Sequence, residues 1–188
     1  MADPSSQQPT VYDYATGTQW RLAFNRLPKT TWFCTAATIP GITLGEAQYA
    51  TPMTDMIVTG DKLTFETLNI TFIVDEELQN YRELWDWIVG MGSPVNHSQW
   101  STELFKGDGA VRTFGTGDKT TYEESNFYSD STLIVYNSKN KAKVNVLFKN
   151  MFPTTLSSLE YSQEPTDVEY FKASATFRYL YYEFETVT

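Results

Sequence analysis

The sequence has very few of the side chains that carry most protein chemistry. Its 188 residues include one cysteine, Cys34, and one histidine, His97. A single cysteine excludes a disulfide within the chain and any zinc or iron–sulfur site built on several cysteines. A single histidine excludes metal sites that need a histidine pair. No run approaches the roughly 18 apolar residues of a membrane-spanning helix, and the start, MADPSSQQPT, lacks the pattern of a signal peptide.

Positive charge is also scarce. Lysine and arginine total 14 against 23 aspartate and glutamate, which gives a net charge of −9 and a pI of about 4.6. A protein that binds duplex DNA needs a clustered basic surface to displace counterions from the phosphates. We therefore expect a soluble, acidic chain that is made inside the cell and has no membrane contact.

Aromatic residues, in contrast, are abundant and make up 15% of the chain. They favour strands, cores and subunit interfaces, because each can bury roughly 150–250 Å² with few rotamers to freeze. A chain that is rich in such residues and poor in catalytic side chains favours assembly over catalysis.

Alternation of apolar and polar residues runs through most of the chain and predicts a mainly β protein. After a flexible N-terminal arm over 1–17, we expect strands at 18–26, 31–38, 63–74, 131–136, 143–148, 156–162 and 167–185. A change of parity near Thr67 suggests a bulge. The polar turn between 131–136 and 143–148 predicts that these two strands form an antiparallel hairpin.

Two segments do not fit a core layer. Residues 41–63 have three glycines and few large apolar side chains, so they predict an extended arm or long hairpin. Residues 93–128 are rich in glycine, serine and threonine, and they predict a long surface loop or insertion, with weak strands possible around 111–114. We expect the whole of 18–188 to form a single domain.

One helix is predicted over 75–91. Asp75 can accept hydrogen bonds from the first turn, and Glu76 and Glu77 suit the positive end of the helix dipole. Apolar residues at three- and four-residue spacing form one stripe: Leu78, Tyr81, Leu84, Trp85 and Ile88. The predicted fold is an antiparallel β-barrel or sandwich with this one packed helix.

The motifs that point to catalysis or metal binding all have simpler interpretations. His97 lies in a polar loop without a nucleophile elbow, and Cys34 lies on an alternating strand, as a buried structural thiol does. The carboxylates of 75–77 belong to a helix start, and the loops around 107–109 and 115–118 lack the residues of a phosphate or calcium site. We expect no enzyme activity, no cofactor and no metal.

Seven segments, taken in order, resemble the tail tube proteins of contractile-tailed bacteriophages. They are FNRLP (24–28), IPGITLGEA (39–47), VTGDKL (58–63), LNITFIVDEELQNYRELWDWI (68–88), SDSTLIVYNS (129–138), FKNMFPTTLSSLEY (148–161) and DVEYFKASATFRYLYYEF (167–184). The resemblance covers nearly all of residues 20–185. It implies a β-barrel-like fold with one helix, in subunits that form hexameric rings and stack into a hollow tube of a virion.

The resemblance also implies partners. These are other copies of the chain, tail sheath and baseplate or neck proteins, a tape-measure protein, and DNA that passes through the lumen without sequence-specific binding. The 41–63 segment matches the hairpin that reaches an adjacent ring. The opening of the chain and the 93–128 segment differ from the commonest tube subunits, so a tube initiator at the baseplate or a tube terminator is the alternative. Because the chain is acidic, we expect a lumen that repels phosphate.

Candidate interface residues follow from this interpretation. They are Leu44, Tyr49, Met53, Met56 and Val58 on the arm, the basic Lys139 and Lys141, the acidic Glu164 and Asp167, and Tyr181. The basic and acidic groups are either two solvated faces or complementary patches that meet between copies. A hypothesis of another class is a glycan-binding module, in which Tyr179, Tyr181, Tyr182 and Phe184 stack on a sugar.

Overall fold

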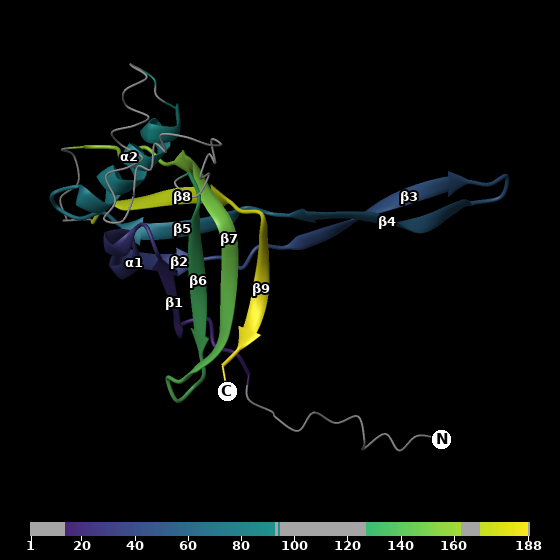
Figure 1. Cartoon of the computed structure of the whole chain (residues 1–188), viewed down its shortest axis with the longest axis horizontal. Helices are drawn as coiled ribbons and strands as arrows, with labels where there is room; N and C mark the ends of the chain where they lie inside the picture. Colours follow the sequence, from purple (N-terminus) through teal and green to yellow (C-terminus); the bar gives the residue numbers. More distant parts are fainter. Residues whose placement is uncertain (1–13, 93, 95–126, 163–169, 188) are drawn as a thin grey trace, which may run out of the picture.

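The computed structural model describes residues 14–92, 94, 127–162 and 170–187. Eleven elements follow one another along these residues: β1 (Trp20–Phe24), α1 (Pro28–Phe33), β2 (Cys34–Ala37), β3 (Ile42–Ala50), β4 (Asp55–Phe65), β5 (Leu68–Ile73), α2 (Gln79–Gly92), β6 (Ser129–Tyr136), β7 (Ala142–Leu156), β8 (Lys172–Arg178) and β9 (Tyr181–Thr186). Figure 1 shows a two-sheet body from which β3 and β4 project as an arm.

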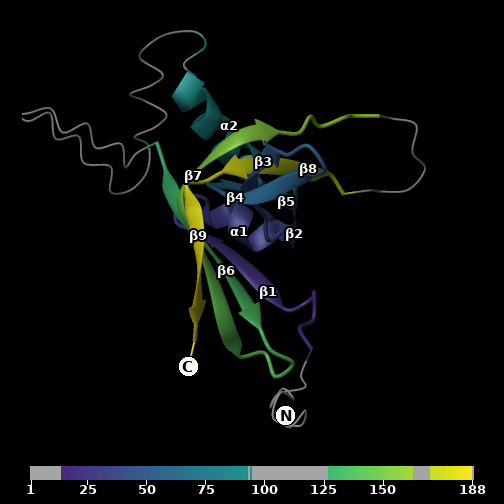
Figure 2. The same ribbon diagram turned by 90° about the vertical axis from the view of Figure 1, so that its right-hand side faces the viewer.

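The body consists of two antiparallel sheets that share strand β7. The first half of β7 lies between β6 and β9, and β1 completes this sheet in the order β1-β6-β7-β9, which we call sheet A. The second half pairs with β8, followed by β5 and β2, which we call sheet B. The strand passes from one sheet to the other near Asn150, which has a φ of 52°. Figure 2 shows sheet A with β1 and β9 at its two sides.

The core lies where the inner faces of the two sheets meet the helices. Alternate residues of each strand point inward, and the largest fully buried side chains include Trp87 on α2, Phe72 on β5, Phe148 on β7 and Phe177 on β8. Phe177 contacts the rings of Phe24 and Trp87, with centroids 5.4 and 6.3 Å away. A mainly β, antiparallel fold was predicted, and it is confirmed.

The structure refines this prediction in two details, because the barrel and the sandwich were left as alternatives and only one helix was expected. The described part of the chain has two helices rather than one, and its sheets do not close into a barrel. The expected strand 31–38 is instead α1 followed by the short β2, because Pro28 sets the first turn of a helix. The buried Thr30 hydroxyl, 3.4 Å from the carbonyl of Asn80, ties this turn to α2.

The two last predicted strands also differ from the structure. No strand covers 156–162, because β7 ends at Leu156 after crossing from sheet A to sheet B. The long run 167–185 divides into β8 and β9, which belong to different sheets. Between them the amide of Leu180 donates to the carbonyl of Lys149 at 3.0 Å, which turns the chain from one sheet to the other.

The helix predicted over 75–91 begins later, at Gln79, so Asp75 is not its cap. Leu78 has a φ of 56°, which breaks the helical path just before it. Asn80, the second residue of α2, instead accepts a first-turn hydrogen bond: its Oδ1 accepts from the amides of Asp75 and Tyr81 at 3.2 and 2.8 Å. Its Nδ2 also donates to the carbonyl of Ile73, so one amide side chain joins β5 to α2.

Candidate assembly surfaces

The β3–β4 arm exposes its side chains almost completely. Every residue of β3 is exposed, and so are most of β4. The exposed apolar side chains include Ile42, Leu44, Tyr49, Met53, Met56, Ile57, Val58 and Leu63. A two-stranded hairpin without a second layer is at best marginally stable in water, and an apolar surface of this extent marks an interaction site.

A close crossing at two glycines divides the arm into a root and a distal half. A methyl group on Gly60 would lie 2.7 Å from the carbonyl oxygen of Gly45, so only glycine allows the strands to approach here. The pairing shifts register at this point. On the root side Leu44 pairs with Leu63, and on the distal side Tyr49 pairs with Met56.

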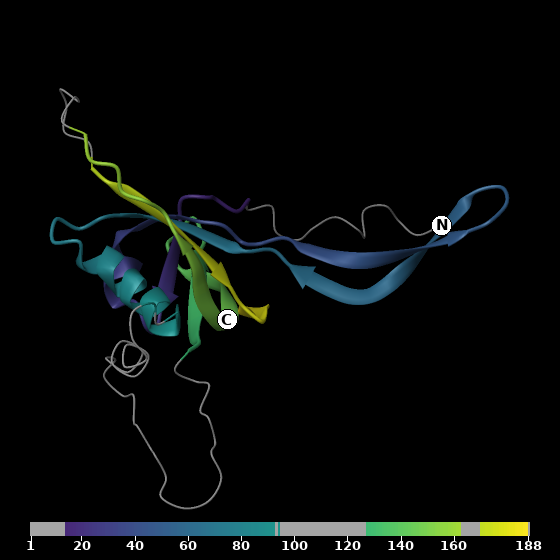
Figure 3. The same ribbon diagram turned by 90° about the horizontal axis from the view of Figure 1, so that it is seen from above.

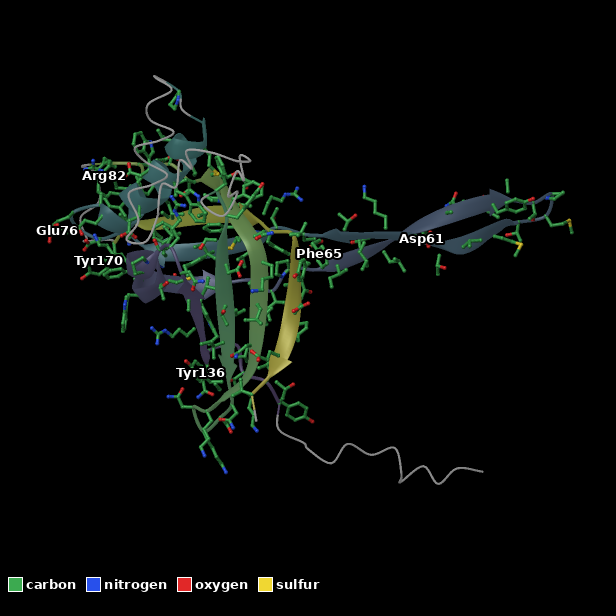
Figure 4. The ribbon with its side chains drawn as sticks, in the orientation of Figure 1. Asp61, Phe65, Glu76, Arg82, Tyr136 and Tyr170 are labelled. Atoms are coloured by element: carbon green, nitrogen blue, oxygen red, sulfur yellow. The ribbon has the colours of Figure 1, made fainter. Side chains whose placement is uncertain are left out.

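An aromatic cluster holds the root of the arm against the body. Phe65, the last residue of β4, packs against Tyr179 and Tyr182 at centroid distances of 6.0 and 5.7 Å. The Tyr182 hydroxyl donates to the carbonyl of Pro40 at 3.1 Å, just before β3 begins. Burial, followed by the charges of nearby groups, raises the pKa of Tyr179 to about 12. Figure 4 labels Phe65 at this junction and Asp61 further along the arm.

Sheet A has open margins in the described part of the chain. No described strand pairs with the outer side of β1 or of β9. Several aromatic side chains at these margins are exposed: Trp32 and Phe33 of α1 beside β1, and Phe184 of β9. An unpaired edge offers a row of free amide and carbonyl groups to another chain. The two edges are therefore candidate contact surfaces.

One ion pair fixes the bend of β7. Lys149 Nζ lies 2.7 Å from Asp130 Oδ2, and the amide of Asn150 donates to Asp130 Oδ1 at 3.1 Å. Burial alone would raise the pKa of Asp130, but the Lys149 and Asn150 hydrogen bonds outweigh it and lower the pKa. The hydrogen bond to Asp130 and its charge raise the pKa of Lys149.

A family model described as "Phage tail tube protein" matches residues 13–185. The chain belongs to this family. Membership makes it a structural component of a virion tail and not an enzyme. None of the curated proteins matches the chain.

Solved structures share the fold of this tail tube protein. The anti-feeding prophage cap, a tube-terminating cap, is 15% identical over 100% of both chains, with a TM-score of 0.57. The sheath–tube complex of an extracellular contractile injection system is 14% identical, covers 94% of this chain and 95% of that one, and has a TM-score of 0.56. The sheath/tube terminator of that system is 12% identical over 93% and 99%, with a TM-score of 0.57.

The predicted interface residues are distributed over three places. The five arm residues lie on β3, β4 or the turn between them, but Leu44 belongs to the root and Tyr49, Met56 and Val58 to the distal half. Lys139 and Lys141 lie in the β6–β7 turn, where both backbone amides donate to Asn137 Oδ1. Tyr181 begins β9 opposite Lys149. Glu164 and Asp167 lie outside the described residues.

Some of the predictions about chemistry can be compared with the structure. Cys34 is half-buried, and burial raises the pKa of its thiol to about 11. His97 and the segments 95–126 and 163–169 lie outside the described residues. Within the described ranges, no cluster of three His, Cys, Asp or Glu side chains is suited to a metal ion. No helix there is long and apolar enough to cross a membrane.

The aromatic platform of the glycan hypothesis is not available as one surface. Tyr179 and Tyr182 pack against each other and against Phe148, with centroid distances between 5.1 and 6.0 Å. Their faces are therefore occupied within the chain, and only Phe184 is largely exposed. Sequence reasoning missed the exposed Trp32 and Phe33, and it named Phe184 only for the glycan hypothesis and not as an interface residue. A signal for the first two was present, since two large aromatics stand side by side directly after a proline-initiated turn.

Proposed function

We propose that this tail tube protein forms hexameric rings that stack into the inner tube of a contractile tail. The observation that carries the proposal is the pair of open edges of sheet A. Strand β1 runs antiparallel to β6, β6 to β7 and β7 to β9, so β1 and β9 run in opposite directions. In a ring, β9 of one copy then continues into β1 of the next as an antiparallel pair.

Closing the ring in this way gives each open edge of sheet A a partner. A cyclic arrangement removes edges that otherwise promote aggregation. The six-fold symmetrised baseplate of the anti-feeding prophage includes a chain of this fold, which supports a ring of six. Stacked rings also explain the exposed arm, because its apolar side chains require a surface outside the chain.

The face of sheet A opposite the core would line the bore. By alternation this face carries the carboxylates of Glu183 and Glu185 of β9 and Asp130 of β6, together with three cations: Lys143 and Lys149 of β7 and Arg21 of β1. Lys149 is already paired with Asp130. Cations that are matched by carboxylates hold phosphate weakly, so the bore lets DNA pass without binding it. The net acidic lumen expected from the charge of the chain stays a prediction.

Further partners are proposed from the relatives. One similar structure is a sheath–tube complex and another is a baseplate, which supports contacts of this tube with a sheath and with baseplate or neck proteins. A tape-measure protein and then DNA would occupy the lumen. We propose synthesis in the cytoplasm of the bacterial host, followed by assembly into the phage tail.

The test is negative-stain electron microscopy and sedimentation velocity of the purified chain over a range of concentrations. We expect rings with a central hole, alone or stacked. The informative variant is Thr186→Pro: the neighbouring amide of Val187 donates to β7, so by alternation the Thr186 N–H points to the open side of β9. Proline there removes a donor from the outer edge only.

Thr186→Ala is the matched control, because it keeps the backbone donor. We expect Thr186→Pro to fold and to lose its rings, while Thr186→Ala keeps them. A wild-type chain that stays monomeric at every concentration and in the particle would overturn the proposal. So would a Thr186→Pro variant that forms normal rings.

A second candidate function is termination or initiation of the tube by a single ring. Two of the similar structures are a tube-terminating cap and a sheath/tube terminator, and their TM-scores equal or exceed that of the sheath–tube complex. The copy number per particle distinguishes the two roles. A repeating subunit is present in as many rings as the tube is long, whereas a terminator or initiator is present in one.

A further inference from the structure

We propose that α1 of one copy docks on the apolar surface formed by Phe184 of β9 and by Leu44 and Leu63 of the arm root of the next copy, with Trp32 as its anchor. This inference rests on the ring proposed above and specifies which side chains hold neighbouring copies together. It concerns two surfaces that lie at opposite edges of sheet A, one beside β1 and the other beside β9.

The first surface is a patch on α1 at the open edge of β1. Trp32 is 77% exposed, which is unusual for the largest apolar side chain. The guanidinium carbon of Arg21, on β1, lies 5.1 Å from the centroid of its ring. Phe33 extends the patch. Tryptophan and arginine are the residues most enriched among those that dominate binding energy at interfaces.

The second surface lies at the open edge of β9 and consists of Phe184 together with Leu44 and Leu63 of the arm root. Phe184 pairs with the buried Val146 of β7 and therefore points to the core side of sheet A, yet it is 62% exposed because no described strand covers it. Its ring contacts that of Tyr182, which in turn contacts Phe65 at the arm root. Two residues from Phe65 along β4, Leu63 pairs with Leu44, and both side chains are about half exposed. Phe184, Leu44 and Leu63 are therefore apolar side chains that no described part of the chain covers.

The two surfaces match in position. Figure 1 shows α1 beyond β1 at one side of sheet A and the arm leaving the body beyond β9 at the other, and Figure 3 shows the same opposition from above. Helix α1 packs on β1, α2 and β5. Phe65 of the arm root packs on Tyr182 of β9, and the ring of Tyr182 also contacts Phe148 of β7, which faces the core. Both surfaces thus lie on the core side of sheet A. Pairing β9 with the next β1 brings them together.

Charge is complementary across the same contact. Residues 14–45 contain no aspartate or glutamate, and Arg21, Arg26 and Lys29 are their only charged side chains. Strand β9 carries Glu183 and Glu185 and no cation, and at the crossing of the arm strands the two carboxylates of Glu46 and Asp61 outnumber the one cation, Lys62. A basic edge and an acidic edge favour the head-to-tail order and oppose pairing of two like edges.

The first test compares two tryptophan truncations. Trp32→Ala removes the anchor, and we expect the concentration at which rings form to rise at least about tenfold, as for an interface hot spot. Trp85→Ala is the matched control. Trp85 lies on α2 and is 49% exposed. It follows Tyr81 by one helical turn and so lies on the same side of α2, where Tyr81 donates to the carbonyl of Ser157. The side of α2 that faces α1 is marked instead by Glu83, which pairs with Lys29. We expect the Trp85→Ala variant to form rings at the same concentration as the wild type.

The second test is covalent. In a Cys34→Ser background, a short bis-maleimide is added to assembled Trp32→Cys/Phe184→Cys protein. Because the two positions lie at opposite edges of one sheet, a bridge between them must join two copies. We expect a ladder of covalent oligomers on a denaturing gel, and none from Trp85→Cys/Phe184→Cys.

The outcomes separate this inference from the proposed function. Rings that form normally with Trp32→Ala, or rings of the double-cysteine variant that give no ladder, overturn the α1 contact and leave ring formation standing. Absence of rings from the wild-type chain overturns both. Circular dichroism of Trp32→Ala should match the wild type, since the ring of Trp32 is largely in solvent; an unfolded variant would contradict the assignment of this residue to the surface.

Discussion

The two-sheet body and the β3–β4 arm are made of similar residues but bury them differently. In the body, β5 alternates between fully buried residues such as Leu68 and Phe72 and more exposed ones. In the arm, β3 has the same mixture of apolar and polar residues, but all of them are exposed. The difference is that the body supplies a second layer, whereas the arm has none within the chain.

This comparison shows which hydrophobic residues serve folding and which serve assembly. Burial of an apolar side chain stabilises the monomer only where the chain itself provides the covering surface. The arm side chains therefore contribute little to the stability of the folded monomer. The favourable free energy of burying them is gained only when another molecule covers them. Substitutions in the two regions should separate stability from assembly.

The largest effect on stability is expected for Phe177→Ala. Phe177 is fully buried between Phe24 and Trp87, and truncating such a side chain leaves a cavity. We expect the free energy of unfolding of the monomer to fall by about 3–5 kcal/mol, measured by chemical denaturation at a concentration below assembly.

The matched variant in the arm is Tyr49→Ala, which also removes an aromatic ring. Tyr49 is 68% exposed, so we expect the free energy of unfolding to change by no more than about 0.5 kcal/mol while assembly is weakened. A loss of stability as large as that of Phe177→Ala would show that the arm packs on its own body, and the comparison would fail.

A second prediction concerns the crossing of the arm strands. A methyl group at Gly60 would lie 2.7 Å from the Gly45 carbonyl oxygen, so Gly60→Ala forces the two strands apart. We expect an unchanged melting temperature of the body and a rise of about tenfold in the concentration needed for assembly, equivalent to about 1.4 kcal/mol. Light scattering against concentration measures it.

Gly17→Ala is its control, because nothing lies within 4 Å of a methyl group there. It should assemble as the wild type does. Normal assembly of Gly60→Ala would show that the geometry of the crossing does not matter for the contact.

The alternation of apolar and polar residues in the sequence predicted much of the division between the body and the arm. It located β1, β6 and the first half of β7, because each strand buries every second residue within the body. It also marked the break at Thr67, which lies between β4 and β5. The sequence also predicted that 41–63 forms an arm or hairpin outside the core, and β3 and β4 occupy this segment; its large apolar residues are exposed rather than scarce.

Other features depended on contacts that no local pattern encodes. Six residues are too few to show helical periodicity, so the sequence predicts a strand from 31 where the end of α1 lies. Thr30 of α1 is buried beside α2, where its hydroxyl lies near the carbonyl of Asn80. The alternation from 167 to 185 is continuous in the sequence, but the chain turns near Leu180 to enter another sheet. Asp75 is a residue type that often caps helices, but here its own amide donates to Asn80 Oδ1.

The candidate surfaces were only partly predictable for the same reason. Leu44 and Tyr49 were found because an arm must expose its side chains. Trp32 and Phe184 were not predicted as interface residues, since α1 packs on the body like any other helix and β9 alternates like any other strand. Their exposure arises from the open edges of sheet A, and an open edge is a property of the strand order, not of any one segment.

A smaller effect is expected where the arm joins the body. Tyr182→Phe removes the hydroxyl that donates to the carbonyl of Pro40 but keeps the ring against Phe65. We expect a loss of about 1 kcal/mol in the free energy of unfolding and faster hydrogen exchange at Gly41 and Glu66, whose backbone groups pair at the arm root. Tyr49→Phe, whose hydroxyl is in solvent, is the control. Equal exchange in both variants would argue against a hydrogen bond that orients the arm.

The smallest effect is expected for the ion pair at the bend of β7, and it depends on pH. The pKa of Asp130 is lowered in the folded chain, so its interactions stabilise the fold above the ordinary pKa of 3.8 and lose this effect as the pH falls through the lowered value. Asp130→Asn should be less stable than the wild type at pH 7, by a small amount because both partners are partly in solvent. The gap between the two denaturation midpoints should close as the solution is acidified below the ordinary pKa. Glu183→Gln, which changes a charge near Lys149 without breaking the 2.7 Å contact, should show a weaker pH dependence. A gap between Asp130→Asn and the wild type that stayed constant with pH would show that the shape of the side chain, rather than its charge, holds the two sheets at their junction.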